Sequence, residues 1–194
     1  MTMKRTSLIA LRMTVLSVLV LGVAYPLAVT GIARLAFPQV SAGSLVKRDG
    51  AVVGSALIGQ AFVSDRYFHS RPSAAGSGYD ALASSASNLA PTSQQLIDDV
   101  QRRVDAVVST EIGARRGDVP VDLVTSSGSG LDPDISPDSA MLQVQRVSQA
   151  RGLDVDVVRD LVRSHVSERQ LGFLGERRVN VLELNLALDA LSSR

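Results

Sequence analysis

The side chains that most often perform catalysis or bind metals are scarce in this chain and form no recognisable active-site pattern. Two histidines are present, His69 and His165, and there is no cysteine. The histidines lie far apart with no second histidine near either of them, so we expect surface or loop roles for both and no metal site. The many serines include no Gly-x-Ser-x-Gly elbow that would present one as a nucleophile. We therefore predict that the chain has no catalytic residues and is not itself an enzyme.

Two short segments have residue types that contact anions in other proteins. Gly54 and Gly59 are spaced like the glycines of a phosphate loop, but the lysine and hydroxyl that would hold phosphate and magnesium are missing. A turn followed by a strand is the better interpretation of this segment. Arg71 precedes Pro72 and could bind an anion, although an arginine in a loop more often bonds backbone carbonyls. We favour the structural role for Arg71.

The composition excludes several classes of partner. Basic and acidic side chains are nearly balanced, 20 against 19, so there is no reason to expect a nucleic-acid partner, which usually requires a concentrated basic stripe. Aromatic residues make up 4% of the chain and tryptophan is absent, which argues against stacking on bases or sugars. Without cysteine there is no disulfide framework and no thiolate metal site.

An uncharged, apolar stretch at residues 13–33 predicts a transmembrane helix. At about 1.5 Å per residue it spans roughly 31 Å, which matches the hydrocarbon core of a bilayer. Lys4, Arg5 and Arg12 precede the stretch, whereas only Arg34 follows it closely. By the positive-inside tendency, residues 1–12 stay in the cytoplasm and the rest of the chain is extracytoplasmic.

A cleaved signal peptide is the competing interpretation of the N-terminus. Small residues such as Ala24 and Ala28 could mark a cleavage site. However, the apolar stretch continues to Phe37 and is longer than the usual hydrophobic region of a signal peptide, so we favour a retained single-pass anchor. Pro26 lies within the span and predicts a kink, because proline removes one backbone donor.

Beyond a linker at residues 34–47, the pattern predicts a soluble α/β (α+β) domain at 48–194 that is helix-rich in its C-terminal half. Ser136 and Pro137 form a helix-start signal that Gly152 ends, and Asn180 with Glu183 has the spacing of a second cap. The expected extended segments are 51–53, 56–63 and 119–125, and the expected loop is 70–91. The expected helices are 92–112, 138–151, 154–166 and a last one after 180. We expect the helix at 154–166 to face inward with Val157, Val158, Leu161 and Val162, and the last helix to place Leu184, Leu188 and Leu191 on one face.

Residues 59–74, 79–92 and 119–137 form three ordered blocks, and the segments 143–151 and 179–189 follow them. Taken together, they resemble the C subunit of the Kdp-type potassium-transporting P-type ATPase, the KdpC family. The resemblance covers nearly the whole chain. Ala86 and Ala90 stand where the family tends to have glycine, so we expect ordinary backbone geometry at both positions. Asp134 replaces a frequent histidine.

The resemblance implies a non-catalytic accessory subunit of an ATP-driven, high-affinity potassium importer in the bacterial inner membrane. Its implied partners are a channel-like potassium-binding subunit, a P-type ATPase subunit that hydrolyses ATP, a small hydrophobic subunit and membrane lipid. The family's proposed role is that of a catalytic chaperone that raises the ATP affinity of the hydrolysing subunit, with no cofactor bound stably. The glutamine proposed to contact nucleotide corresponds to Gln143.

The charge pattern and the proposed nucleotide contact disagree. ATP is cytoplasmic, whereas the basic flank places Gln143 outside the cell, so an effect on ATP affinity would have to be an indirect coupling between conformations. The structural alternative to nucleotide contact is that Gln143 is an ordinary polar residue of the predicted helix 138–151. A different class of function, a stand-alone membrane-anchored envelope binding or sensor module, is suggested by the long Ser- and Gly-rich loop.

Overall fold

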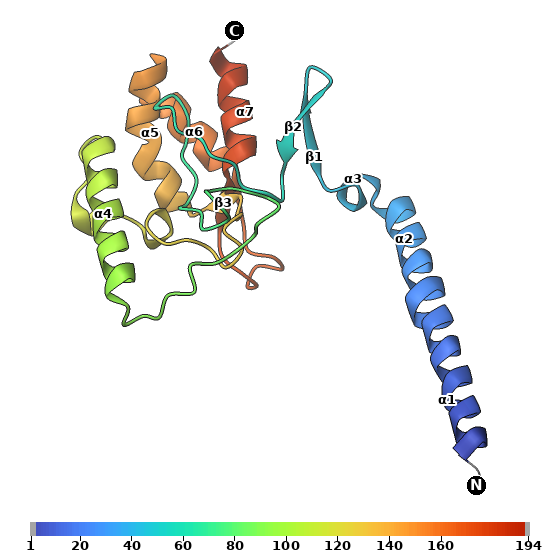
Figure 1. Ribbon diagram of the computed structural model, residues 1–194. Helices are drawn as coiled ribbons and strands as arrows, with labels where there is room; N and C mark the ends of the chain where they lie inside the picture. Colours follow the sequence, from blue (N-terminus) through green and yellow to red (C-terminus); the bar gives the residue numbers. More distant parts are fainter. Residues whose placement is uncertain (1–2, 193–194) are drawn as a thin grey trace. The chain divides into compact units, whose positions relative to one another are not determined.

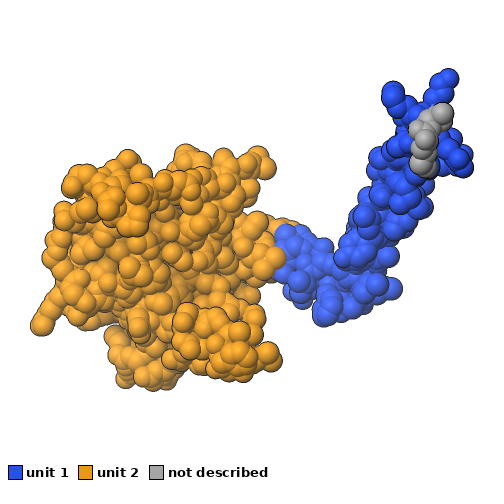
Figure 2. Space-filling view, turned by 90° about the horizontal axis from the view of Figure 1, so that it is seen from below, with its two compact units in different colours: residues 1–45 blue, residues 46–194 orange. Residues whose placement is uncertain are grey.

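The computed structural model describes residues 3–192. Residues 1, 2, 193 and 194, at the ends of the predicted segments 1–12 and 48–194, lie outside the described residues. The chain divides into two compact units, Met1–Leu45 and Val46–Arg194, which are coloured separately in Figure 2. The predicted boundary between linker and domain therefore falls close to the boundary between the two units.

The first unit is an apolar helix long enough to cross a membrane. It runs over Met3–Ala36 and includes an 18-residue stretch with a mean hydropathy of 2.2 in which no residue is buried (Figure 1). The predicted span 13–33 lies inside this helix, which continues through the basic residues on its N-terminal side. Its parts are α1 (Met3–Ser17), the π-helix η1 (Val18–Ala24) and α2 (Tyr25–Ala36), and a short helix α3 (Pro38–Ser41) follows.

The π-helical segment lies immediately before Pro26. The backbone N–H of Tyr25 donates to the carbonyl of Val20, five residues back, rather than to the usual fourth residue. A proline ring clashes with the carbonyl four residues before it, and widening the preceding turn is a recognised way to accommodate such a disturbance. Where we expected a kink at Pro26, the structure has a local change of helix type.

The second unit combines two small sheets with four α-helices among the described residues. A hairpin of β1 and β2 begins the unit, and β3, β5 and β4 form an antiparallel sheet in that order. The elements are β1 (Leu45–Arg48), β2 (Ala51–Ser55), α4 (Gln94–Thr110), the 3-10 turns η2 (Arg116–Asp118) and η3 (Val121–Leu123), β3 (Asp134–Ile135), α5 (Pro137–Arg151), α6 (Val155–Ser164), β4 (Val166–Ser167), β5 (Arg178–Asn180) and α7 (Val181–Ser192).

The core of the domain lies where α5, α6 and α7 pack together over β5 (Figure 1). Leu184 and Leu188 of α7 are fully buried, as predicted for the apolar face of the last helix. Phe68, which belongs to no helix or strand, fills the same cluster. Helix α4 is only half-buried along its apolar face and packs at the edge of the domain.

Both predicted helix caps are present. The Ser136 hydroxyl accepts from the N–H of Ser139 at 3.1 Å, and Gly152 ends α5 in the left-handed conformation with φ of 67°. At the start of α7, the Asn180 side chain accepts from the N–H of Glu183 at 3.1 Å. The helix boundaries of this half of the domain thus follow from local hydrogen bonding that the sequence encodes.

Three predictions about local structure are wrong. Residues 56–63 form turns and irregular backbone rather than a strand, and the N–H of Gly59 instead bonds the Leu131 carbonyl at 2.8 Å. Residues 119–125 contain the 3-10 turn η3, because Thr125 bonds back to the carbonyl of Val121 through both its N–H and its hydroxyl. Val157 of α6, expected to face inward, is 46% exposed.

The long loop is confirmed, since no helix or strand occurs between residues 56 and 93 of the described chain. Neither Ala86 nor Ala90 is among the residues with positive φ, so both have the ordinary geometry that we expected. The left-handed positions of this loop are instead taken by Gly76, Gly78, Tyr79 and Asn88. An alanine in place of the family's glycine is therefore tolerated at both positions.

Candidate functional site

Gln143, the residue that the resemblance connects with nucleotide, lies inside the domain rather than on its surface. It is 1% exposed. Its amide nitrogen donates to the carbonyls of His69 and Ser139, both at 3.2 Å. Its amide oxygen accepts from the N–H of His69 at 2.7 Å and from Arg146 at 2.8 Å. The chain itself therefore uses both donors and both acceptor positions of this side chain.

Asn185 of α7 bonds the peptide groups of Phe68 in the same way that Gln143 bonds those of the next residue, His69. Its side-chain oxygen accepts from the N–H of Phe68 at 2.9 Å, and its nitrogen donates to the Phe68 carbonyl at 3.0 Å. Asn185 is also 1% exposed. Two amide side chains from different helices thus hydrogen-bond the peptide groups of two consecutive residues, as a neighbouring β-strand would. We call Gln143 and Asn185 the amide pair.

Arg146 extends this network from α5. Its guanidinium donates to the carbonyls of Asp65 and Tyr67 at 2.7 and 3.0 Å, and forms a buried ion pair with Glu111 at 2.9 Å. Burial raises the pKa of Glu111, and the charge of Arg146 opposes that rise. Because both side chains are only 5% exposed, the loss of either one would leave an uncompensated buried charge.

A cavity of about 190 Å³ adjoins Gln143. Its lining includes Gln143, His69, Ser70 and Glu111, and one carboxylate oxygen of Glu111 has no hydrogen-bond partner. Phosphate groups are normally held by cationic side chains and backbone N–H donors, and a carboxylate repels them. A nucleotide that contacted the Gln143 amide would also have to break one of its existing bonds.

The two segments considered as anion contacts, at Gly54–Gly59 and at Arg71, have structural roles in the described domain. Arg71 bonds the Asp132 carboxylate at 2.7 Å and approaches the Thr125 carbonyl, so the interpretation of Arg71 as a residue that binds its own chain is supported. Gly54 and Gly59 allow close packing: an added Cβ on Gly59 would lie 2.5 Å from the Asp132 carbonyl oxygen.

The Asp189 carboxylate binds three side chains from distant parts of the chain, and the sequence patterns did not identify it. Its carboxylate accepts from Arg48 of β1 at 2.7 Å, from Arg151 of α5 at 2.8 Å and from the Tyr67 hydroxyl at 3.2 Å. The Arg151 guanidinium also stacks over the Tyr67 ring, 4.7 Å from its centroid. Burial alone would raise the pKa of Asp189. The hydrogen bonds from Arg151 and Arg48 outweigh this effect and hold the pKa of Asp189 below its ordinary value.

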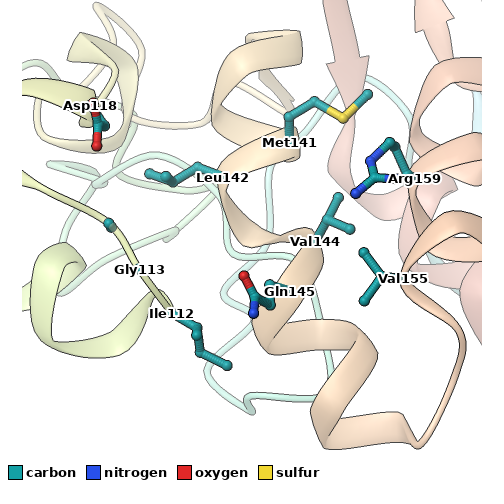
Figure 3. A pocket seen from close by; sticks show the side chains of 10 residues that line it. Ile112, Gly113, Asp118, Met141, Leu142, Val144, Gln145, Val155 and Arg159 are labelled. Carbon is teal, nitrogen blue, oxygen red and sulfur yellow. The ribbon is translucent and has the colours of Figure 1, made fainter.

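A second hollow of about 330 Å³ lies between α5, the start of α6 and the turn after α4 (Figure 3). Val144 and Val155 face each other across it, and Ile112 and Met141 contribute further apolar surface. Arg159 lies at its edge and is already paired with Asp156. Asp118 and Gln145 also line the hollow, so its surface is partly polar and carries both an acidic and a basic group.

These features define a class: a membrane-associated protein made of one apolar helix and a small α+β domain whose central polar residues bind one another. The sequence matches the family described as "K+-transporting ATPase, c chain" over residues 7–190. The chain belongs to this family.

Individual relatives agree with that assignment. The chain is 59% identical to the "Potassium-transporting ATPase KdpC subunit" of Gemmatimonas aurantiaca over 185 residues, which cover 95% of this chain and 92% of the relative. It is 57% identical to the subunit of the same name from Rhodospirillum rubrum over 171 residues, 88% of each chain. The Mycobacterium tuberculosis H37Rv subunit is 52% identical over 189 residues, 97% of this chain and 100% of the relative.

Replacing Gln143 by alanine should lower the free energy of unfolding by about 3 kcal/mol, because the peptide groups of His69 and one donor of Arg146 lose buried partners. Urea unfolding of the chain in detergent, followed by circular dichroism, measures this. Gln149→Ala, at an exposed position of the same helix, is the control and should change stability by less than about 0.5 kcal/mol. Equal stability of the two variants would contradict the role of Gln143 as part of the amide pair.

His69 should make the domain less stable in acid. Burial, together with the charge of Arg146, lowers the pKa of His69 from 6.5. The unfolded chain therefore takes up a proton that the folded chain does not, and stability falls as the pH drops below about 6.5 toward the lower folded pKa. His69→Gln should flatten this part of the stability profile between pH 7 and 5, whereas His165→Gln should leave the contribution of His69 in place. An unchanged profile for His69→Gln would be incompatible with this explanation.

Proposed function

We propose that this chain is a non-catalytic accessory subunit of an ATP-driven, high-affinity potassium importer, and that it stabilises the assembled complex. The family match over residues 7–190 is the observation that carries the proposal. Its partners are a channel-like potassium-binding subunit, a P-type ATPase subunit that hydrolyses ATP and a small hydrophobic subunit. Membrane lipid surrounds the anchor helix. Catalysis of ATP hydrolysis belongs to the P-type partner.

The internal network supports a role without catalysis. Gln143, Asn185 and Arg146, the most deeply buried polar side chains of the candidate site, bond one another or the backbone of residues 65–69. A catalytic group must instead present a reactive atom to a bound substrate. The polar centre of the domain therefore holds its shape, and what the domain offers to other molecules is its outer surface.

The orientation of the chain follows from its charge. Basic residues lie on the N-terminal side of the span, so the N-terminus is cytoplasmic and the domain is extracytoplasmic, on the outer side of the bacterial inner membrane. The domain part of the chain is mildly acidic. At physiological salt its field is screened beyond about 8 Å, so any attraction of cations is confined to the immediate surface.

The described geometry supports indirect action on ATP use. With its amide engaged by its own chain and its side chain on the far side of the membrane from cytoplasmic ATP, Gln143 acts as a positioning residue. A change in ATP affinity would then be a coupling free energy transmitted through the partner subunits. The chain holds no stably bound cofactor in this proposal.

Tagging the chain and purifying it from membranes of potassium-starved cells should recover a P-type ATPase subunit and a channel-like subunit together with it, because an accessory subunit is stable in its complex. Mass spectrometry of the eluate identifies the partners. Recovery of the chain without any P-type ATPase would favour the alternative function, a stand-alone membrane-anchored binding or sensor module.

The same preparation distinguishes positioning from nucleotide contact. Asn185→Ala is the matched control for Gln143→Ala, since it removes the equivalent bonds to Phe68. If both residues act through the fold, the two variants should lower the yield of complex together and show similar KM values for ATP. A rise in KM for ATP restricted to Gln143→Ala would instead support direct contact between this amide and nucleotide.

Protease added to intact spheroplasts should digest residues 48–194, because the domain lies outside the cytoplasm in the proposed orientation. Immunoblotting for the domain follows the loss, and a cytoplasmic protein of the same cells controls for lysis. Survival of the domain until the spheroplasts are broken would reverse the proposed orientation.

A further inference from the structure

The turn that joins β4 to β5 exposes three large apolar side chains at its tip. Leu171 is 84% exposed, Phe173 is 69% exposed and Leu174 is 47% exposed. The turn is the loop that extends below β3 in Figure 1. We call Leu171, Phe173 and Leu174 the apolar tip. Scattered exposed apolar residues are common, but three within four residues at the end of a projecting turn call for an explanation.

The shape of this turn is fixed by its backbone and not by burial. Gln170 and Leu174 exchange N–H to carbonyl hydrogen bonds, both at 2.9 Å, and the N–H of Gly172 bonds the Arg169 carbonyl at 3.1 Å. Leu171 and Gly172 both have positive φ, 52° and 82°. A leucine rarely adopts this conformation, so the turn holds its apolar side chains outward in a conformation that needs the hydrogen bonds around it.

Charged residues surround the tip in pairs of opposite sign. Arg169 pairs with Glu176, and Arg177 pairs with Glu168 at 3.0 Å. Because each charge has its partner within the turn, the tip can approach an apolar phase without carrying an unpaired charge with it. The cationic members of these pairs also suit the phosphate level of a lipid headgroup layer.

We propose that the apolar tip inserts into the boundary between the headgroups and acyl chains of the bilayer that holds the anchor helix, as a second membrane contact of the domain. This rests on membrane anchoring and not on the transporter role. Only residues 37–44 separate the end of α2 from β1, so the tether reaches at most about 28 Å. A domain held this close meets the membrane surface at a high effective concentration, and a weak apolar contact suffices.

A lipid surface fits this tip better than a protein pocket does. A stable protein interface usually buries about 1,200 Å² or more and matches polar groups around its rim, which three side chains on one narrow turn cannot supply. Insertion into lipid requires apolar side chains at a projecting point and no shape match. The tip would also restrict rotation of the domain about its single helical anchor.

The chain contains no tryptophan, so Phe173→Trp introduces a unique fluorescent reporter at the tip. The full-length variant is reconstituted into vesicles of phosphatidylcholine and phosphatidylglycerol, with and without brominated acyl chains. Emission should shift to shorter wavelength in vesicles, and brominated lipid should lower it by about twofold. Leu82→Trp, at a position that is 99% exposed in a different loop, is the matched control and should remain in water.

Adding Leu171→Ser and Leu174→Ser to Phe173→Trp should reduce the quenching by lipid, with circular dichroism confirming that the helices are intact. Two results would overturn the proposal. One is quenching of Phe173→Trp by brominated lipid no greater than that of Leu82→Trp. The other is a blue shift that appears only when the partner subunits are reconstituted with the chain, since the tip would then contact protein.

Discussion

The fold depends on satisfying the peptide groups of one buried segment that has no strand beside it. Residues 64–71 form neither helix nor strand, yet Phe68 at their centre is fully buried. A buried peptide N–H or C=O without a partner costs about 1–3 kcal/mol, so Phe68 can fill the core only because the amide pair takes the place of a neighbouring strand. The carbonyls before it are held by Arg146.

This arrangement gives the buried polar side chains a structural role in the domain. Gln143 joins α5 to the buried segment, and Asn185 joins α7 to it. Arg146 links Gln143 and the buried segment to Glu111 at the end of α4. Removing one member leaves groups without partners in a region of low dielectric constant. Any property of the subunit that depends on a well-ordered domain would then change.

Local signals predicted more of the structure than long-range ones did. The apolar anchor, the caps at Ser136 and Asn180, and the stop at Gly152 were visible because they depend on residues a few positions apart. The hairpin turn at Asp49 and Gly50, both with positive φ, had a known signal that we missed. The strand assigned to 119–125 is wrong because alternating apolar residues also occur in a partly buried turn, here with Leu123 and Val124 buried, and periodicity alone does not separate the two. The buried contacts that define the site could not be predicted. They join Gln143 to residues 74 positions away and Asn185 to residues 117 positions away.

The position of Asp189 has a mechanical consequence. A pull on the anchor helix enters the domain through the β1–β2 hairpin, which follows it in the chain. The Arg48–Asp189 ion pair fastens that hairpin to α7, and Arg151 and Tyr67 brace the same carboxylate from behind. Tension would therefore be shared among the elements bonded to Asp189, and the hairpin would not separate from α7 before the other contacts are loaded. A bilayer that thickens, thins or bends would in this way transmit force to α7 and the hydrophobic core that it helps to form.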